Sequence, residues 1–132
     1  MTRLNEVALK RLIKGGETTT VEFKVATPRP VEIAERLCGM ANAQGGMIII
    51  GVEDVERKVV GVPDERMAMT KDVILRAARQ IIKPALVLDP LEPEIYEIEG
   101  KQLVVATVPP NDGSVYQAGG VFWEDVVRIQ CY

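Results

Sequence analysis

The most apolar stretch of the chain, residues 47–52, constrains the fold more than any other feature of the sequence. It follows the pair Gly45-Gly46 and ends at Glu53-Asp54. A short apolar run without polar alternation is typical of a buried strand. We therefore expect a central strand of a sheet over residues 47–52, with Asp54 at its carboxyl end.

Three segments have the apolar spacing of amphipathic helices, namely residues 3–14, 31–44 and 70–83. Pro30 suits the first turn of the second helix, where a missing N–H costs nothing. In that helix Glu32 and Arg36 form an i,i+4 pair opposite the apolar stripe. Thr70 is the expected N-cap of the third helix, and Pro84 ends it.

The remaining segments have the pattern of strands and turns. Val21 and Phe23 alternate with Glu22 and Lys24, which predicts a half-buried strand over residues 19–25. Glu99-Gly100 predicts a hairpin turn. The other expected strands are residues 95–98, 103–108 and 121–129, with a short strand or turn at 59–62. This order predicts one α+β domain over residues 1–132, with a mixed sheet flanked by helices.

Composition excludes several classes of protein. Apolar residues make up 47% and charged residues 27% of the 132 residues, which favours a folded domain over disorder. No run approaches the roughly 18 apolar residues of a membrane span, and no signal peptide is recognisable, so we expect a cytoplasmic protein with no membrane contact. The absence of histidine excludes Ser-His-Asp and Cys-His catalysis and histidine-ligated zinc. Cys38 and Cys131 form no CxxC pair, and we expect Cys38 to be a buried residue without a disulfide.

Charge is unevenly distributed along the chain. Residues 1–83 carry 14 basic and 11 acidic side chains, whereas residues 84–132 carry 2 and 8. This balance excludes a uniformly basic nucleic-acid binder but permits a basic face on the first part of the chain. The candidate nucleic-acid contacts are Lys10, Lys14, Lys24, Arg76, Arg79, Lys83 and Arg128. A solvated helix face is the alternative interpretation of the spacing of Arg76, Arg79 and Lys83.

Acidic side chains near the first strand suggest a second type of chemistry. Alternate residues of a strand share a face, so Glu22 and Lys24 project together. With Glu17 and Asp54 close by, three carboxylates and one lysine could perform Mg²⁺- or Mn²⁺-dependent phosphodiester cleavage. Glu17, Glu22 and Asp54 would then hold the metal, and Lys24 would assist catalysis. The alternative is an ion pair in which Lys24 neutralises the acids and no metal binds.

Two further features have both a structural and a functional interpretation. Gly45-Gly46 lacks a following Lys-Ser or Lys-Thr, so it is not a P-loop. It is either a helix end with a tight entry into the next strand or a nest of N–H groups for phosphate. Phe122 and Trp123 point to opposite faces of the last strand, where one is expected in the core and the other at an interface or a stacking surface.

Taken in order, the motifs resemble the Schlafen-type Alba-like domain family. The matching segments are residues 17–24 (ETTTVEFK), 41–46 (ANAQGG), 47–54 (MIIIGVED) and 60–62 (VGV). A late R-x-G-S element of the family is matched only by Arg128, because Gln130 and Cys131 replace Gly and Ser. The resemblance implies an α+β fold related to Alba-type nucleic-acid binders.

The resemblance also implies function. Its members often stand in transcriptional regulators or helicase-like proteins, so a regulatory or accessory module that binds DNA or RNA is the leading hypothesis. Animal members cleave RNA with three acids, which match Glu17, Glu22 and Asp54 here, so a nuclease is the alternative. A protein-interaction module is a third. No cofactor is required unless the protein is a nuclease, in which case Mg²⁺ or Mn²⁺ is. Because animal members contain two related lobes, this chain is expected to form a homodimer, with residues 121–129 as the contact.

Overall fold

The centre of the molecule is a four-stranded mixed sheet. A computed structural model describes residues 4–25, 29–119 and 129–130. The strands lie in the order β1 (Val21–Lys24), β2 (Gly46–Ile50), β5 (Lys101–Val108) and β4 (Glu94–Ile98). β1 and β2 are parallel and the other neighbours are antiparallel. The expected α+β fold with a mixed sheet is confirmed.

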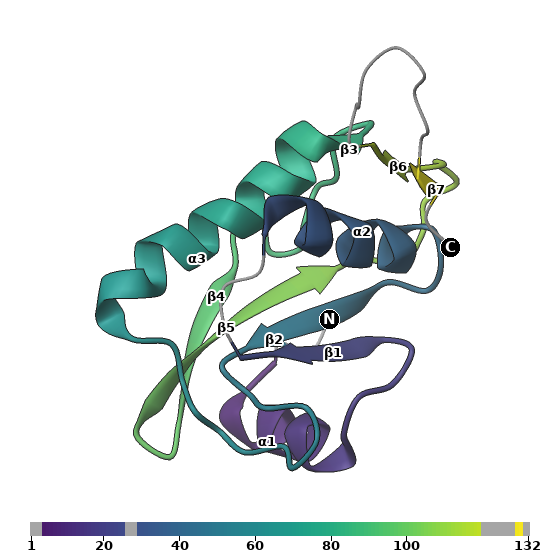
Figure 1. Ribbon diagram of the computed structural model, residues 1–132. Helices are drawn as coiled ribbons and strands as arrows, with labels where there is room; N and C mark the ends of the chain where they lie inside the picture. The colour runs from purple at the N-terminus through teal and green to yellow at the C-terminus, as the bar shows by residue number, and fades with distance from the viewer. Residues whose placement is uncertain (1–3, 26–28, 120–128, 131–132) are drawn as a thin grey trace.

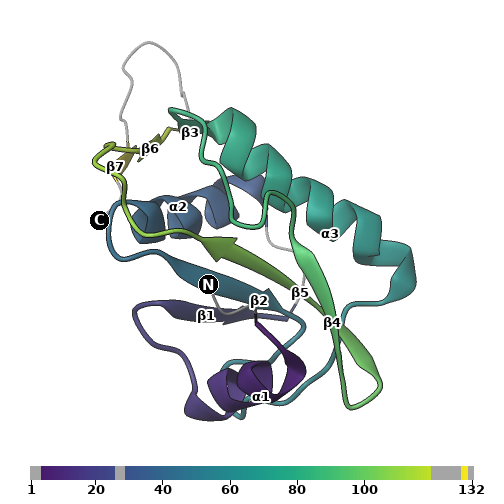
Figure 2. The ribbon, with the colours of Figure 1, turned by 180° about the vertical axis from the view of Figure 1, so that it is seen from behind.

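Helices cover both faces of this sheet (Figures 1 and 2). α2 (Pro30–Ala41) and α3 (Asp64–Arg76) lie on one face, and α1 (Glu6–Gly15) lies on the other. Within the described residues, none of these helices has the length and apolar character needed to cross a bilayer.

β2 is the buried central strand that the sequence predicts. Ile48, Ile49 and Ile50 are all completely inaccessible to solvent. Ile48 and Ile50 belong to the apolar cluster that includes α2 and α3, whereas Ile49 belongs to the cluster that includes Leu9 and Ile13 of α1. Successive side chains of a strand point to opposite faces, so an unbroken apolar run requires a packed layer on each side.

The third helix differs from its expected boundaries. Thr70 does not cap it: its side chain is fully buried in the middle of α3, and its hydroxyl donates to the carbonyl of Arg66 at 2.8 Å. The helix begins after Pro63 instead. Acidic Asp64 and Glu65 lie in its first turn, where their negative charges interact favourably with the helix dipole. A π-helical turn, η1 (Ala77–Ile81), continues the helix, and strand β3 (Ile82–Lys83) follows it. The expected helix over residues 82–83 is therefore wrong.

The predicted hairpin between residues 95–98 and 103–108 is confirmed. β4 and β5 are joined by the two residues Glu99 and Gly100, both at positive φ (54° and 76°). This is the backbone of a type I′ turn, whose twist matches that of the two strands.

A second, smaller antiparallel sheet contains β3, β6 (Gln117–Ala118) and β7 (Ile129–Gln130). The sequence predicts one sheet with a long last strand over 121–129. Residues 120–128 lie outside the described part of the chain, so Phe122, Trp123, Arg128 and most of the expected dimer strand lie there too. Val59, in the expected short strand, forms an isolated bridge with Val52.

Cys38 is completely buried, as expected from its place in the apolar stripe of α2. Its sulfur is part of a disulfide, so the expectation of a cysteine without a disulfide is wrong. Cys131 lies outside the described residues.

Asn42 and Asn111 attach the loop before β6 to the end of α2. The side-chain amide of Asn42 donates to the carbonyl of Tyr116 at 2.9 Å and accepts the N–H of Tyr116 at 2.8 Å. Asn111 donates to the carbonyl of Ala41 at 2.7 Å. The asparagine of the ANAQGG segment therefore has a structural role, which sequence patterns alone did not indicate.

Gly45-Gly46 is a tight entry into β2. The N–H of Gly45 donates to the carbonyl of Met40, and Gly45 has φ 82°. A Cβ on Gly45 would lie 2.5 Å from the carbonyl oxygen of Val108, and one on Gly46 would lie 2.6 Å from that of Thr20. Both residues are required because the backbones of adjacent segments approach them closely, which supports the structural interpretation of this pair.

We expect Gly45→Ala to lower the free energy of unfolding by about 3 kcal/mol, because positive φ and a backbone clash both oppose the new methyl group. Gly113 is the matched control, since it has φ 100° with nothing within 4 Å of an added Cβ. Gly113→Ala should therefore cost only about 1 kcal/mol. Urea unfolding of both variants measures the difference, and equal destabilisation would contradict the assigned close approach.

Candidate functional site

A basic hollow lies between α1 and the segment that follows β2. It has a volume of about 630 Å³. We define it by four cationic side chains: Lys10 and Lys14 of α1, and Arg57 and Lys58 of the turn between Val52 and Val59.

Local structure explains how α1 contributes to this hollow. Asn5 caps the helix by accepting the N–H of Ala8 at 2.8 Å. Leu9 and Ile13 face the sheet and are buried, which leaves Lys10 and Lys14 exposed one turn apart. The two ammonium groups therefore lie on the same side of α1.

The turn between Val52 and Val59 supplies the other two cations. Glu53 stabilises this turn, because its carboxylate accepts the N–H groups of Val55 and Glu56. Arg57 has a positive φ of 59°, and its Nη1 would lie 3.2 Å from a Cβ placed on Gly16. The small residue at the end of α1 thus allows the guanidinium to lie against it.

The hollow has a net positive charge and an apolar floor. Among the described residues, Glu56 and Glu99 are the acidic ones that line it, and Ile13, Val59 and Ile98 are the apolar ones. Four cations against two carboxylates favour an anionic ligand such as a phosphate group. The described part of the chain places no aromatic side chain in this lining. Its contacts therefore suit phosphate and sugar rather than base stacking.

The candidate nucleic-acid residues do not form a single face. Lys10 and Lys14 lie in the basic hollow, on the α1 side of the sheet. Arg76, Arg79 and Lys83 were expected on one helical face, but they fall in α3, η1 and β3 respectively. All three are exposed, and Arg76 pairs with Asp72 at 2.9 Å.

Sequence patterns did not identify two cations of the basic hollow, Arg57 and Lys58. Arg57 and Lys58 stand in a polar turn without helical or strand spacing, so no periodicity marks them. The only local feature that could mark them as functional residues is that they are adjacent in a turn after a buried strand. Their proximity to Lys10 and Lys14 depends on the packing of α1 against the sheet.

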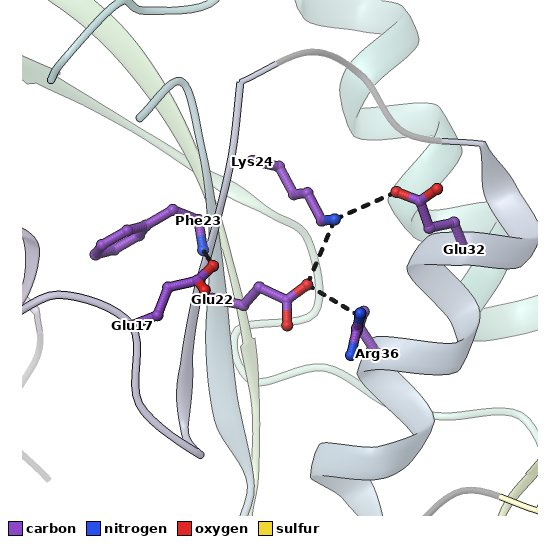
Figure 3. A network of polar contacts seen from close by, with 6 residues as sticks. All are labelled: Glu17, Glu22, Phe23, Lys24, Glu32 and Arg36. Carbon is purple, nitrogen blue, oxygen red and sulfur yellow. Dashed lines mark hydrogen bonds and ion pairs between the residues drawn. The ribbon is translucent and has the colours of Figure 1, made fainter. Parts of the chain in front are cut away.

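Lys24 belongs to a different group of charges, which joins β1 to α2 (Figure 3). Glu22 and Lys24 share the α2 side of β1, as predicted, with Nζ of Lys24 3.7 Å from Glu22. Glu22 also contacts Nε of Arg36 at 3.1 Å, and Lys24 contacts Glu32 at 3.3 Å. Glu32 and Arg36, expected to pair with each other, instead pair with strand residues.

Glu17 has a distinct position at the outer edge of β1. Its carboxylate accepts the N–H of Phe23 at 2.9 Å (Figure 3). The N–H of Thr18 donates to the carbonyl of Val21 at 3.0 Å. The segment before β1 therefore folds back and occupies hydrogen-bonding groups of the edge strand.

The three carboxylates expected to share a metal are not brought together. Glu17 is close enough to Glu22 to affect its pKa. Asp54, in contrast, is exposed in the turn between Val52 and Val59 and is not among the charges that act on Glu22. In the described ranges, no three acidic or cysteine side chains form a group that could hold a metal ion. The geometry instead pairs Glu22 with Lys24 of the same strand and with Arg36 of α2, and the pair with Arg36 ties β1 to α2.

Burial determines the ionisation of Glu22. Its side chain is only 18% exposed, and the loss of water around the carboxylate raises its pKa above the ordinary value of 4.5. Arg36 and Lys24 oppose this effect, and the charge of Glu17 adds to it. The net direction is upward, so the folded state holds a proton on Glu22 more strongly than the unfolded chain does.

This shift predicts a pH dependence of stability. Well below pH 4.5 Glu22 is protonated in both states. As pH rises through 4.5 toward the raised pKa, the unfolded state ionises first and gains stability relative to the folded state. Relative to Glu22→Gln, the wild-type protein should therefore become progressively less stable as pH rises from below the ordinary pKa of 4.5 to above the raised pKa, and the difference should then stay constant. Urea unfolding of the two proteins at several pH values measures this difference.

Glu32→Gln is the control, because it also removes a carboxylate from Lys24 but at a more exposed position (40%). A similar pH trend in both variants, or none in Glu22→Gln, would contradict the assigned role of burial.

Known families and solved structures share this fold. The family described as "Schlafen, AlbA_2" matches residues 17–128. The match begins after α1, so it includes Arg57 and Lys58 but not Lys10 and Lys14. No curated protein matches the chain.

Two solved structures align with the chain. The solution NMR structure of the N-terminal domain of a putative ATP-dependent DNA helicase RecG-related protein from Nitrosomonas europaea is 20% identical, with a TM-score of 0.60. The alignment covers 94% of this chain and 85% of that domain. The crystal structure of the DIP2311 protein from Corynebacterium diphtheriae is 16% identical, with a TM-score of 0.49, over 84% of this chain and 24% of that one. At 20% identity the likeness to the Nitrosomonas europaea domain concerns the fold alone.

Proposed function

Because the chain belongs to the Schlafen AlbA_2 family, we propose that it is a nucleic-acid-binding module with a regulatory or accessory role. We further propose that this role lies in transcriptional regulation and that the protein is cytoplasmic. The name of the Nitrosomonas europaea relative, a DNA helicase RecG-related protein, is consistent with a nucleic-acid context for this fold.

The basic hollow is the observation that carries the proposal. Lys10, Lys14, Arg57 and Lys58 come from two segments that are about 40 residues apart in the chain, yet they line one concave surface. Cations gathered in this way neutralise phosphates and release bound counterions, which is the main source of affinity for DNA and RNA backbones.

The test is binding of the whole chain to fluorescent duplex DNA, single-stranded DNA and duplex RNA across a salt series. We expect measurable affinity at low salt that falls as salt rises. Lys10→Gln/Lys14→Gln should weaken binding and reduce the slope of log K against log salt by about one for each phosphate that the variant no longer neutralises. Fluorescence anisotropy gives both quantities.

Arg76→Gln/Arg79→Gln is the matched control, because it removes the same charge from the other side of the sheet. We expect this variant to keep most of the wild-type affinity and its salt slope. Weaker binding confined to the Arg76 and Arg79 variant would place the interface on α3 and η1 and refute the role of the basic hollow. No affinity at low salt for any of the three probes would refute nucleic-acid binding.

We also propose that the protein acts as a homodimer. Two copies would supply the paired surface that the two lobes of animal Schlafen proteins provide in one chain. Twofold pairing is the commonest way for identical chains to associate. Light scattering at high micromolar concentration should give twice the 14.5 kDa of one chain, and a monomer mass there would remove this proposal.

A further inference from the structure

The two edges of the main sheet differ in how their backbone groups are used. β1 is one edge strand, and the carboxylate of Glu17 and the N–H of Thr18 bind its outward groups. β4 is the other edge strand. An edge strand with free N–H and C=O groups is a template on which another strand can pair.

The hairpin geometry shows which groups of β4 point outward. A two-residue turn makes the flanking residues Ile98 and Lys101 a hydrogen-bonded pair. Antiparallel pairs alternate, so the backbone groups of Ile95 and Glu97 point away from β5. Consistently, the carbonyl of Gln102, opposite Glu97, points to the other side of β5 and accepts the N–H of Val62 at 2.7 Å.

These outward groups are open. Within residues 4–25, 29–119 and 129–130, no backbone hydrogen bond to the outward N–H or C=O of Ile95 or Glu97 is present. The side chain of Ile95 is 43% exposed, and Glu97 is exposed as well. The outer edge of β4 thus presents two backbone N–H donors, two carbonyl acceptors and the exposed side chain of Ile95.

The charge of this strand indicates its partner. The segment 89–99 contains five acidic residues and no lysine or arginine: Asp89, Glu92, Glu94, Glu97 and Glu99. In a twofold pairing of β4 with a second copy, two acidic strands would face each other, and the register centred on Glu97 would set the two copies of this carboxylate opposite one another. Like charges placed opposite each other destabilise a strand pair, whereas opposite charges stabilise it.

We propose that the outer edge of β4 binds an extended lysine- or arginine-rich segment of a partner protein by strand addition. Main-chain hydrogen bonds to Ile95 and Glu97 supply the affinity, and the acidic side chains select a basic segment. An apolar residue of the partner strand packs on Ile95. This proposal does not rest on the function proposed for the basic hollow, because the β4 edge attracts cations rather than phosphates, although Glu99 lies next to both surfaces.

The probe is an eight-residue peptide of alternating lysine and valine, labelled for fluorescence polarisation with the whole chain. A second peptide has the same sequence with every backbone nitrogen methylated, so it keeps its charge but cannot donate to a strand. We expect the methylated peptide to bind at least about tenfold more weakly. Equal binding of the two peptides, or no binding of the first, would overturn the proposal.

Variants of the protein test the same contact from the other side. Glu97→Pro removes an outward donor without breaking a bond to β5, which an edge strand tolerates. It should weaken peptide binding by about tenfold, whereas Glu97→Gln, which removes the same carboxylate but keeps the outward N–H, should weaken it by less than about threefold. Wild-type affinity in a folded Glu97→Pro variant would overturn strand addition.

Hydrogen exchange of the wild-type protein tests strand addition even if the proline variant does not fold. In the wild-type protein, the amides of Ile95 and Glu97 should exchange more slowly when the unmethylated peptide is bound. Unchanged exchange at both amides under saturating peptide would overturn the proposal, because an added strand must cover them.

Discussion

Burial of β2 on both faces is the constraint on which the rest of the structure depends. Ile48 and Ile50 require one packed layer and Ile49 requires another, so helices must cover both sides of the sheet. α2 and α3 form the first layer, and α1 forms the second. Gly45 and Gly46 let the strand begin against the backbones of Val108 and Thr20, where side chains would collide.

This layered arrangement determines where charge accumulates. β1 lies at the edge of the sheet, so the α2 side of that strand has room for Glu22 and Lys24 beside Ile48 and Ile50 of β2. Their contacts with Arg36 and Glu32 bind the edge strand to α2. Packing of α1 on the opposite face turns its polar side outward, toward the turn that follows β2. One sheet thus separates an ion network of paired charges from a basic hollow with a net positive charge.

The two kinds of charged cluster differ in what they can do. Acidic and basic groups that are paired and partly buried satisfy one another, and they act mainly on stability. The cations of the basic hollow outnumber the described carboxylates that line it, so they favour an external anion. Membership of the Schlafen AlbA_2 family and the shared fold do not by themselves identify a ligand, and it is the net positive charge of the basic hollow that favours phosphate.

Local patterns in the sequence were sufficient for the central strand, the β4–β5 hairpin and the shared face of Glu22 and Lys24. Each of these depends on backbone periodicity or turn geometry over a few residues. The start expected for α3 was wrong because the hydroxyl of a buried Thr70 can donate a hydrogen bond to a carbonyl of the preceding helical turn. The residue type of Thr70 therefore did not mark an N-cap.

Tertiary structure alone decided which charges meet. Arg76, Arg79 and Lys83 have regular helical spacing, yet the π-helical turn and β3 separate them into three elements. Arg57 and Lys58 have no spacing at all, yet they lie beside Lys10 and Lys14. Periodicity identifies the side of an element that faces the core, because that depends on neighbouring residues. It cannot identify what lies opposite the other side, because that depends on how distant segments pack across the sheet.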